Sequence, residues 1–272
     1  MLKGINQWCY PTGTKLEKVF EYSRNAGFDV VELNLNPIGD VGLTMETTKK
    51  EAEEITQLAS QYGLQLRSLS TALLWQTPLS SPDEAVRNKG IKVIEKMLEI
   101  ASIIGMDTIL VVPGSVTPEV SYDACYRRSQ TALKKVIPTA EKLGVKIGIE
   151  NVWNKFLLSP LEMAQYIDQL DSKYVGAYFD IGNVLQFGYP EQWIDILGQR
   201  IFKVHVKDFK TSTGNATGFT TLLSGDVNWQ AVKQELNKID YRDTLVAELS
   251  PYAHCPHMLA DDTARHIERI IK

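Results

Sequence analysis

Four residues with metal-binding side chains end short apolar runs in the second half of the chain. The runs are KIGIE, AYFD, FKVH and LVAE, and their last residues are Glu150, Asp180, His205 and Glu248. Three carboxylates in one pocket would repel one another and raise each other's pKa unless a cation neutralised them. We therefore predict that these four side chains bind one divalent ion. Carboxylate and imidazole donors suit Mn²⁺, which we expect first, and also Mg²⁺, Co²⁺ or Zn²⁺.

The two glutamates of this set suggest a reaction as well as a metal site. If Glu150 and Glu248 stand on opposite faces of a bound hydroxy-ketone, one can remove a proton and the other can return one to the opposite face. This pair of proton transfers is an epimerisation. The same proton transfers shifted by one carbon interconvert an aldose and a ketose. Both reactions pass through an enediolate, whose charge a bound cation stabilises. We predict Glu150 and Glu248 as the catalytic acid/base pair of a sugar isomerase or epimerase.

A repeating pattern of elements would bring these residues together. Eight short apolar runs alternate with amphipathic helical segments such as 45–62, 82–104 and 122–143. Runs that are apolar throughout are typical of parallel strands buried on both faces. The predicted strands are Leu2–Asn6, Val30–Leu33, Leu64–Leu69, Thr108–Val112, Val145–Glu150, Val175–Asp180, Ile201–Val206 and Thr244–Glu248.

Eight strand–helix units of about 34 residues each predict an α/β fold, a single (β/α)₈ TIM barrel over residues 1–272. Glycines close several helices before the next strand, and Ser81-Pro82 and Ser159-Pro160 are typical of helix starts. An open doubly wound sheet would need a glycine-rich turn after the first strand, where the chain reads NQWCYP. In a barrel, the carboxyl ends of all strands open onto one face. The longest irregular stretch, 207–226, is expected to be a functional loop.

Bulk composition excludes several partners. The chain carries 29 basic and 33 acidic residues, a net charge of −4, which speaks against nucleic acid. No run approaches the length of a membrane span, and no leader sequence precedes the first strand. Three scattered cysteines make no disulfide framework, so we expect a cytoplasmic protein without membrane attachment.

The residues around the four ligands resemble the xylose-isomerase-like barrels, and within them the D-tagatose 3-epimerase and L-ribulose-5-phosphate 3-epimerase branch of sugar (phosphate) isomerases and epimerases. The resemblance covers essentially the whole chain and is densest in IENVWNKF, FDIGN, VHVKD, GDVNW and AE. It implies that Glu150, Asp180, His205 and Glu248 bind the metal and that the two glutamates move protons. It also implies a small sugar or sugar-phosphate substrate and a homodimer or homotetramer.

Two positions depart from that family pattern. Asn183 stands where many such epimerases carry a substrate-binding His, in a pattern more similar to the sugar-phosphate members. Leu157 stands where a Glu often follows the Asn-Lys/Arg-Phe segment. Both departures speak against a free ketose as the substrate, Asn183 favours a phosphorylated sugar, and the metal chemistry is unchanged.

Further residues are candidates for binding the substrate. Glu32, at the end of the second predicted strand, could bind sugar hydroxyls or form a structural ion pair. Trp8 and Trp153 could stack on a sugar or simply pack, since aromatic side chains serve both purposes. Lys207 could neutralise a phosphate or assist proton transfer. Arg67 breaks an apolar strand and therefore requires an anionic partner.

Three other functions compete with the isomerase. A metal-dependent dehydratase of a keto-cyclitol or related acid would start with the same deprotonation. An endonuclease-type phosphodiesterase on this barrel would need many histidines, and the chain has only four. A sugar-sensing barrel without catalysis would be expected to have lost one of the four ligands, and all are present.

Overall fold

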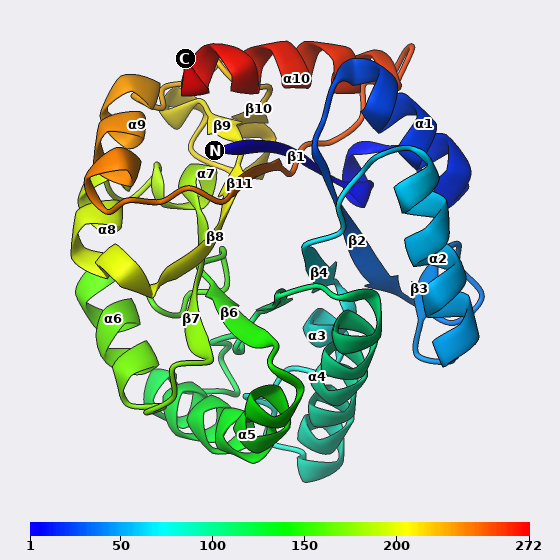
Figure 1. The fold of residues 1–272 in the computed structure, drawn as a ribbon. Coiled ribbons are helices and arrows are strands. Elements are labelled where there is room, and N and C mark those ends of the chain that lie inside the picture. The colour runs from blue at the N-terminus through cyan, green and yellow to red at the C-terminus, as the bar shows by residue number, and fades with distance from the viewer.

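The computed structural model describes residues 1–272 as a closed barrel of eight parallel strands (Figure 1). Each strand pairs in parallel with its neighbours, and pairing of β1 with both β2 and β11 closes the ring. The barrel strands, in ring order, are β1 (Leu2–Asn6), β2 (Val30–Asn36), β4 (Ser68–Thr71), β5 (Thr108–Val111), β6 (Lys146–Glu150), β7 (Val175–Asp180), β8 (Ile201–Val206) and β11 (Thr244–Ala247). This ring confirms the predicted TIM barrel.

Helices surround the ring on its outside (Figure 1). Their apolar faces pack onto the strands and form most of one large hydrophobic core. The helices are α1 (Leu16–Ala26), α2 (Lys49–Gln61), α3 (Leu73–Gln76), α4 (Glu84–Ile104), α5 (Tyr122–Leu143), α6 (Pro160–Asp168), α7 (Ile181–Val184), α8 (Pro190–Leu197), α9 (Trp229–Lys238) and α10 (Met258–Ile271). No helix is both long and apolar enough to cross a membrane.

The strand boundaries differ from the predictions by more than one residue at two strands. β2 continues to Asn36, three residues beyond the predicted end at Leu33. The apolar pattern stops earlier than the strand because Asn34 and Asn36 occupy its last positions. The third strand spans Ser68–Thr71 instead of 64–69, and the preceding segment makes only an isolated bridge between Gln65 and Val30.

Helix ends follow the local chemistry that the sequence indicates. Gly27, Gly105 and Gly144 take left-handed conformations at the ends of α1, α4 and α5. Ser159 caps α6 by accepting a hydrogen bond from the Glu162 amide, as predicted. The start of α4 differs, because Asp83 rather than a serine accepts from the first turn. The predicted start of α2 at residue 45 is also too early, since Thr48 and Glu51 form a capping box there.

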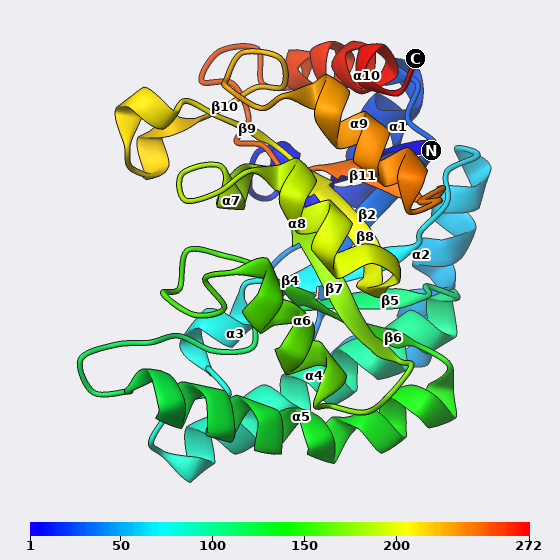
Figure 2. The same ribbon diagram turned by 90° about the vertical axis from the view of Figure 1, so that its left-hand side faces the viewer.

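The segment 207–226 is held by its own contacts. Its short strands β9 (Asp208–Phe209) and β10 (Phe219–Thr220) pair antiparallel, and both project from the end of the barrel that also carries α7 (Figure 2). The Asp208 carboxylate accepts hydrogen bonds from the Val227 amide at 3.1 Å and the Trp229 indole at 3.0 Å. The predicted loop therefore contains a hairpin anchored to the start of α9.

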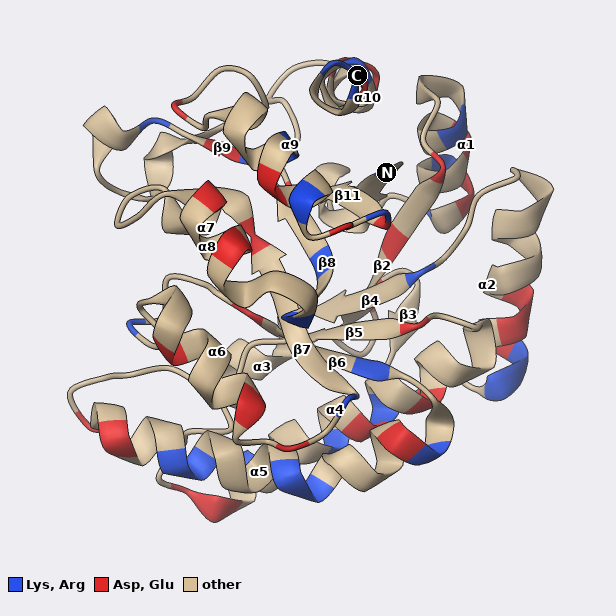
Figure 3. Cartoon of the chain, turned by 60° about the vertical axis from the view of Figure 1, so that its left-hand side comes forward, with Lys and Arg blue, Asp and Glu red and all other residues tan.

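Charged side chains of both signs are interspersed on the outer helices (Figure 3). The basic doublet Arg127-Arg128 lies on α5, where Arg127 pairs with Asp123 at 2.5 Å. Neutralisation one turn away is typical of a solvated helix face.

Candidate metal centre and active site

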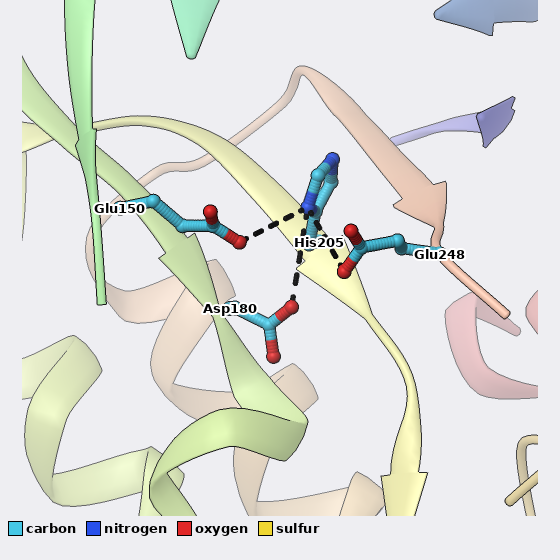
Figure 4. Close-up of side chains that lie close together, drawn as sticks. All are labelled: Glu150, Asp180, His205 and Glu248. Atoms are coloured by element: carbon cyan, nitrogen blue, oxygen red, sulfur yellow. Dashed lines mark ion pairs between the residues drawn. The ribbon is translucent and has the colours of Figure 1, made fainter. Parts of the chain in front are cut away.

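Four side chains from neighbouring strands converge at the carboxyl end of the barrel (Figure 4). Glu150 ends β6, Asp180 ends β7, His205 lies near the end of β8, and Glu248 follows β11. His205 Nδ1 lies 3.6 Å from Glu150 Oε1, 3.9 Å from Asp180 Oδ2 and 3.7 Å from Glu248 Oε2. One ligand atom from each residue lies within 4.8 Å of all the others. We call these four residues the metal cluster.

The two nitrogens of His205 have different surroundings. Nδ1 is buried without a hydrogen-bond partner, whereas Nε2 lies 2.7 Å from Glu32 Oε1. An ionised carboxylate only accepts, so in the neutral imidazole Nε2 carries the hydrogen and Nδ1 presents its lone pair to the three carboxylates. One nitrogen and three oxygen donors facing a common point fit a divalent cation.

The carboxylates around His205 also favour a positive charge at this position. Burial acts to lower its pKa, but the carboxylate of Glu32 and those around Nδ1 outweigh burial and raise the pKa well above its ordinary value. The position therefore favours a positive charge next to Nδ1.

Asn151 fixes the end of β7 beside the cluster. Its amide donates to the Asp180 carbonyl at 2.8 Å and accepts from the Asp180 backbone amide at 2.9 Å. Asp180 Oδ1 then caps α7 by accepting from the Asn183 amide at 2.8 Å. Because Oδ1 is used in this way, Oδ2 is the oxygen left to face His205.

Glu32 lies deeper than predicted. Since β2 runs on to Asn36, Glu32 is a mid-strand residue whose side chain is fully buried inside the barrel. It accepts hydrogen bonds from Asn6 Nδ2 at 2.6 Å, from Ser68 Oγ at 2.5 Å and from the Tyr178 hydroxyl. The predicted contact with sugar hydroxyls is incompatible with this burial. Glu32 instead contacts Nε2 of the His205 imidazole from inside the barrel.

Tyr178 is a site residue that the sequence reasoning missed. Its ring lies edge-on to the His205 ring with centroids 4.6 Å apart, and its hydroxyl reaches Glu32. The two-residue period of a strand places Tyr178 on the same face as Asp180. That signal was available in the sequence.

Lys207 follows β8 and turns back into the metal cluster. Its Nζ lies 2.5 Å from Glu248 Oε2 and 2.9 Å from Asp180 Oδ2. The close passage depends on Gly182, where a Cβ would lie 2.5 Å from Lys207 Cγ. Burial acts to lower the pKa of Lys207, but the charges of Asp180 and Glu248 outweigh it and raise the pKa.

The two glutamates of the cluster differ in proton affinity. Burial raises the pKa of Glu150, and the charge of Glu248 adds to that rise. Burial also raises the pKa of Asp180 against the opposing charge of Lys207. For Glu248, the charges of Lys207 and His205 outweigh burial and lower the pKa. A pair of carboxyls with separated proton affinities can serve as the acid and the base of one reaction.

The remaining predicted residues near the cluster are Asn183, Trp153 and Trp8. Asn183 donates to the Asn151 carbonyl at 2.9 Å and accepts from the Trp153 indole at 2.8 Å through its own carbonyl. Trp153 packs against Phe219 with ring centroids 5.0 Å apart. Trp8 lines a cavity of about 440 Å³ together with Lys207, Phe219 and Glu248. We call it the metal-side cavity.

Arg67 lies at the opposite end of the barrel. It precedes β4 and pairs with Asp243 at 3.1 Å and Asp107 at 3.4 Å. Fully buried Lys203 joins the same carboxylates at 2.6 and 2.9 Å. The predicted anionic partner exists, but it is structural. The assignment of Arg67 to substrate binding is wrong, because residues that precede strands lie at the end of the barrel away from the site.

Comparison with known proteins identifies the family to which this barrel is similar. A family model described as a xylose isomerase-like TIM barrel matches residues 20–270. A putative L-ribulose-5-phosphate 3-epimerase, SgbU, from Escherichia coli strain K12 is 23% identical over 231 residues, which are 84% of this chain and 81% of that protein.

Two solved structures illustrate the similarity in three dimensions. A D-tagatose 3-epimerase-like protein superposes with a TM-score of 0.83 at 20% identity, covering 100% of this chain and 97% of its own. A D-psicose 3-epimerase with D-tagatose, from Clostridium cellulolyticum H10, gives 0.82 at 16% identity with 100% of both chains covered. At these identities the likeness establishes the fold.

Proposed function

Because this chain belongs to the xylose isomerase-like TIM barrel family, we propose that it is a divalent-metal-dependent sugar isomerase or epimerase. The observation that carries the proposal is the convergence of three carboxylates on the lone pair of His205 Nδ1. The reaction would be ketose 3-epimerisation or aldose–ketose isomerisation. The three similar proteins described above are named as sugar 3-epimerases or as a protein like one, which favours the first.

In this proposal, the metal cluster would hold one divalent ion. A bound divalent ion would supply positive charge that stabilises the oxygen anion developing on the substrate. Glu150, Asp180, His205 and Glu248 would hold that ion. Mn²⁺ is the ion that we propose, and Mg²⁺, Co²⁺ and Zn²⁺ are the alternatives for this donor set.

Glu150 and Glu248 would move the proton. They come from β6 and β11, which are separated in the ring by β7 and β8, so their carboxylates approach the cluster from different sides (Figure 4). Either carboxylate could abstract the proton on its own face of the substrate, and the other could return one on the opposite face. An enediolate of the substrate lies between the two steps.

Residues around the cluster would orient the sugar. Lys207 stands beside Glu248 and would keep that carboxylate ionised between turnovers. Trp8 lines the metal-side cavity and would present an apolar wall to the sugar ring. We propose that Asn183 and Trp153 shape the adjoining loops through the hydrogen bond between them.

A hydrogen-exchange assay tests the proposed function. The protein, supplied with Mn²⁺ in D₂O, is incubated with a panel of ketoses and ketose phosphates, and loss of C–H signal at carbon 3 or carbon 1 is followed by NMR. We expect one substrate class to incorporate deuterium and to yield its epimer or aldose. Exchange should stop on chelation and return with Mn²⁺. Exchange that survives chelation would contradict the proposal, and loss of water from the substrate would point to the dehydratase.

A further inference from the structure

The mouth of the barrel has two halves with different chemistry. The metal cluster lies over β6, β7, β8 and β11, and β1, β2, β4 and β5 form the facing half of the ring (Figure 1). A second cavity, of about 210 Å³, lies over this facing half. Gln7, Trp8, Asn34 and Asn36 line it, and we call it the amide cavity. Trp8 also lines the metal-side cavity and so stands at the boundary between the two.

The amide cavity is lined by uncharged polar groups. Gln7 Oε1 accepts a hydrogen bond from the backbone amide of Asn34, and Asn36 Nδ2 donates one to the Val41 carbonyl. Gln7 Nε2 and Asn36 Oδ1 are left without partners in the protein. One free donor and one free acceptor in a concave, partly aromatic wall are suited to sugar hydroxyls. No Lys or Arg lines this cavity, and its one charged residue is Asp40. A phosphate there would meet a like charge and no counter-charge.

The metal-side cavity offers no better place for a distant phosphate. Lys207 is its one basic residue, and its ammonium lies between Asp180 and Glu248, at the reacting end of the site. A terminal phosphate of a five- or six-carbon sugar lies at the other end of the molecule. Lys155 lines a third cavity, whose lining is mostly apolar.

Asn183 is weaker evidence for a phosphorylated substrate than its position in the sequence suggests. Its side chain donates to the Asn151 carbonyl, its backbone amide donates to Asp180, and its carbonyl accepts from Trp153. These bonds hold the loops after β6 and β7 together. The side-chain amide of Asn183 is therefore explained by its role in holding these loops, and it requires no phosphate ligand.

Resting on the proposed function, we propose that the substrate is uncharged and larger than one monosaccharide. Its ketose part would occupy the metal-side cavity. A neutral polyhydroxyl group, such as a second sugar unit, would pass Trp8 and enter the amide cavity. Gln7 Nε2 and Asn36 Oδ1 would bind its hydroxyls.

Matched substrates test this inference. Exchange at carbon 3 and at carbon 1 in D₂O with Mn²⁺ is compared for D-fructose, D-fructose 6-phosphate and 6-O-glucosyl-D-fructose, which differ only in the group on O6. The comparison is repeated with the other ketohexoses. We expect kcat/KM for the glucosyl ketose to exceed that for the phosphate by about tenfold or more, consistent with a hydrogen-bonded subsite. Fastest exchange of the phosphate or of the free ketose would overturn the inference and leave the proposed function standing. Exchange of none of the sugars would overturn the proposed function itself.

A bulky side chain at the rim of the amide cavity gives a second test. Ala72 is exposed and lines this cavity, so Ala72→Trp should obstruct it without disturbing the core. We expect the ratio of kcat/KM for the glucosyl ketose to that for the free ketose to fall about tenfold. Lys50→Trp, at an exposed position on α2, is the matched control and should leave the ratio unchanged. An unchanged ratio in Ala72→Trp with Mn²⁺ affinity intact would contradict the assignment of the cavity.

Discussion

His205 Nε2 contacts Glu32 Oε1 at 2.7 Å inside the barrel, and this contact leaves Nδ1 directed at the carboxylates of the metal cluster. Glu32 is itself held by Asn6, Ser68 and Tyr178, so the imidazole rests on a buried polar network. Burial acts to raise the pKa of Glu32, but the charge of His205 outweighs it and the pKa is lowered. An ionised Glu32 thus fixes which nitrogen is free to bind a cation.

The role of Glu32 can be measured by metal binding alone. Glu32→Gln keeps the shape of the side chain but loses the charge that orients the imidazole, so we expect Mn²⁺ affinity to fall by about 10–100-fold. Isothermal titration calorimetry measures the change. Glu17→Gln, at an exposed position on α1, is the control. Wild-type affinity in Glu32→Gln would show that the contact is not needed.

Lys207→Met should change metal binding in the opposite direction. The ammonium lies within 3 Å of two predicted metal ligands and repels a cation bound there. Removing its charge should raise Mn²⁺ affinity by about fivefold, a modest screened Coulomb effect. Weaker Mn²⁺ binding in this variant would contradict the assignment.

Cys9 supports the backbone on both sides of Glu248. Its buried thiol donates to the Ala247 carbonyl at 3.3 Å and its sulfur accepts from the Leu249 amide at 3.2 Å. Cys9→Ala should leave both groups unpaired, lower the free energy of unfolding by about 1–3 kcal/mol and slow exchange. Cys9→Ser can restore both hydrogen bonds and should lose less. Equal behaviour of the two variants in urea unfolding would show that the hydrogen bonds contribute nothing.

The ion-pair cluster at the far end of the barrel predicts a pH dependence of stability. Burial acts to raise the pKa of Asp243, but the charges of Lys203 and Arg67 outweigh it, so the pKa is lowered from 3.8. A lowered pKa in the folded state contributes stability above the unfolded pKa, and that contribution is lost as the pH falls through the folded value. Asp243→Asn should therefore be less stable than wild type by about 1–3 kcal/mol at pH 7.

The size of that difference should stay constant between about pH 8 and pH 5 and shrink only below about pH 4. Chemical unfolding across this range measures it. Asp171→Asn, at an exposed position with φ of 48° that both residue types tolerate, is the control. A difference that already changes between pH 8 and pH 5 would mean that another group titrates.

Much of the fold and the cluster could be predicted because both follow from local patterns. Apolar strands separated by amphipathic helices predict the barrel, and the family match confirms the resemblance to xylose-isomerase-like barrels. The four predicted ligands stand at or next to strand ends, where the fold itself brings them together. The position of each side chain along its strand was harder to predict. Glu32 and Arg67 both lie in apolar runs. A small shift of the strand boundary decides whether such a side chain points into the mouth of the barrel, into its interior or toward the opposite end of the barrel.

The amide cavity could not be predicted because its residues share no sequence pattern. Gln7 lies after β1 and Asn36 ends β2, and neither belongs to a recognisable motif. Only closure of the ring between β1 and β2 brings them to one wall.

Deuterium incorporation by variants of the two glutamates tests the central claim most directly. Wild type, Glu150→Gln and Glu248→Gln are each saturated with Mn²⁺, whose binding is verified by calorimetry, and exchange at the reacting carbon of the active ketose is followed in D₂O. We predict one deuterium per turnover in wild type. In a glutamine variant that retains Mn²⁺, formation of the deuterated epimer should fall by about 100-fold or more, because the remaining glutamate can act on only one face. Near-normal formation of the deuterated epimer in Glu248→Gln with Mn²⁺ bound would contradict the two-base scheme.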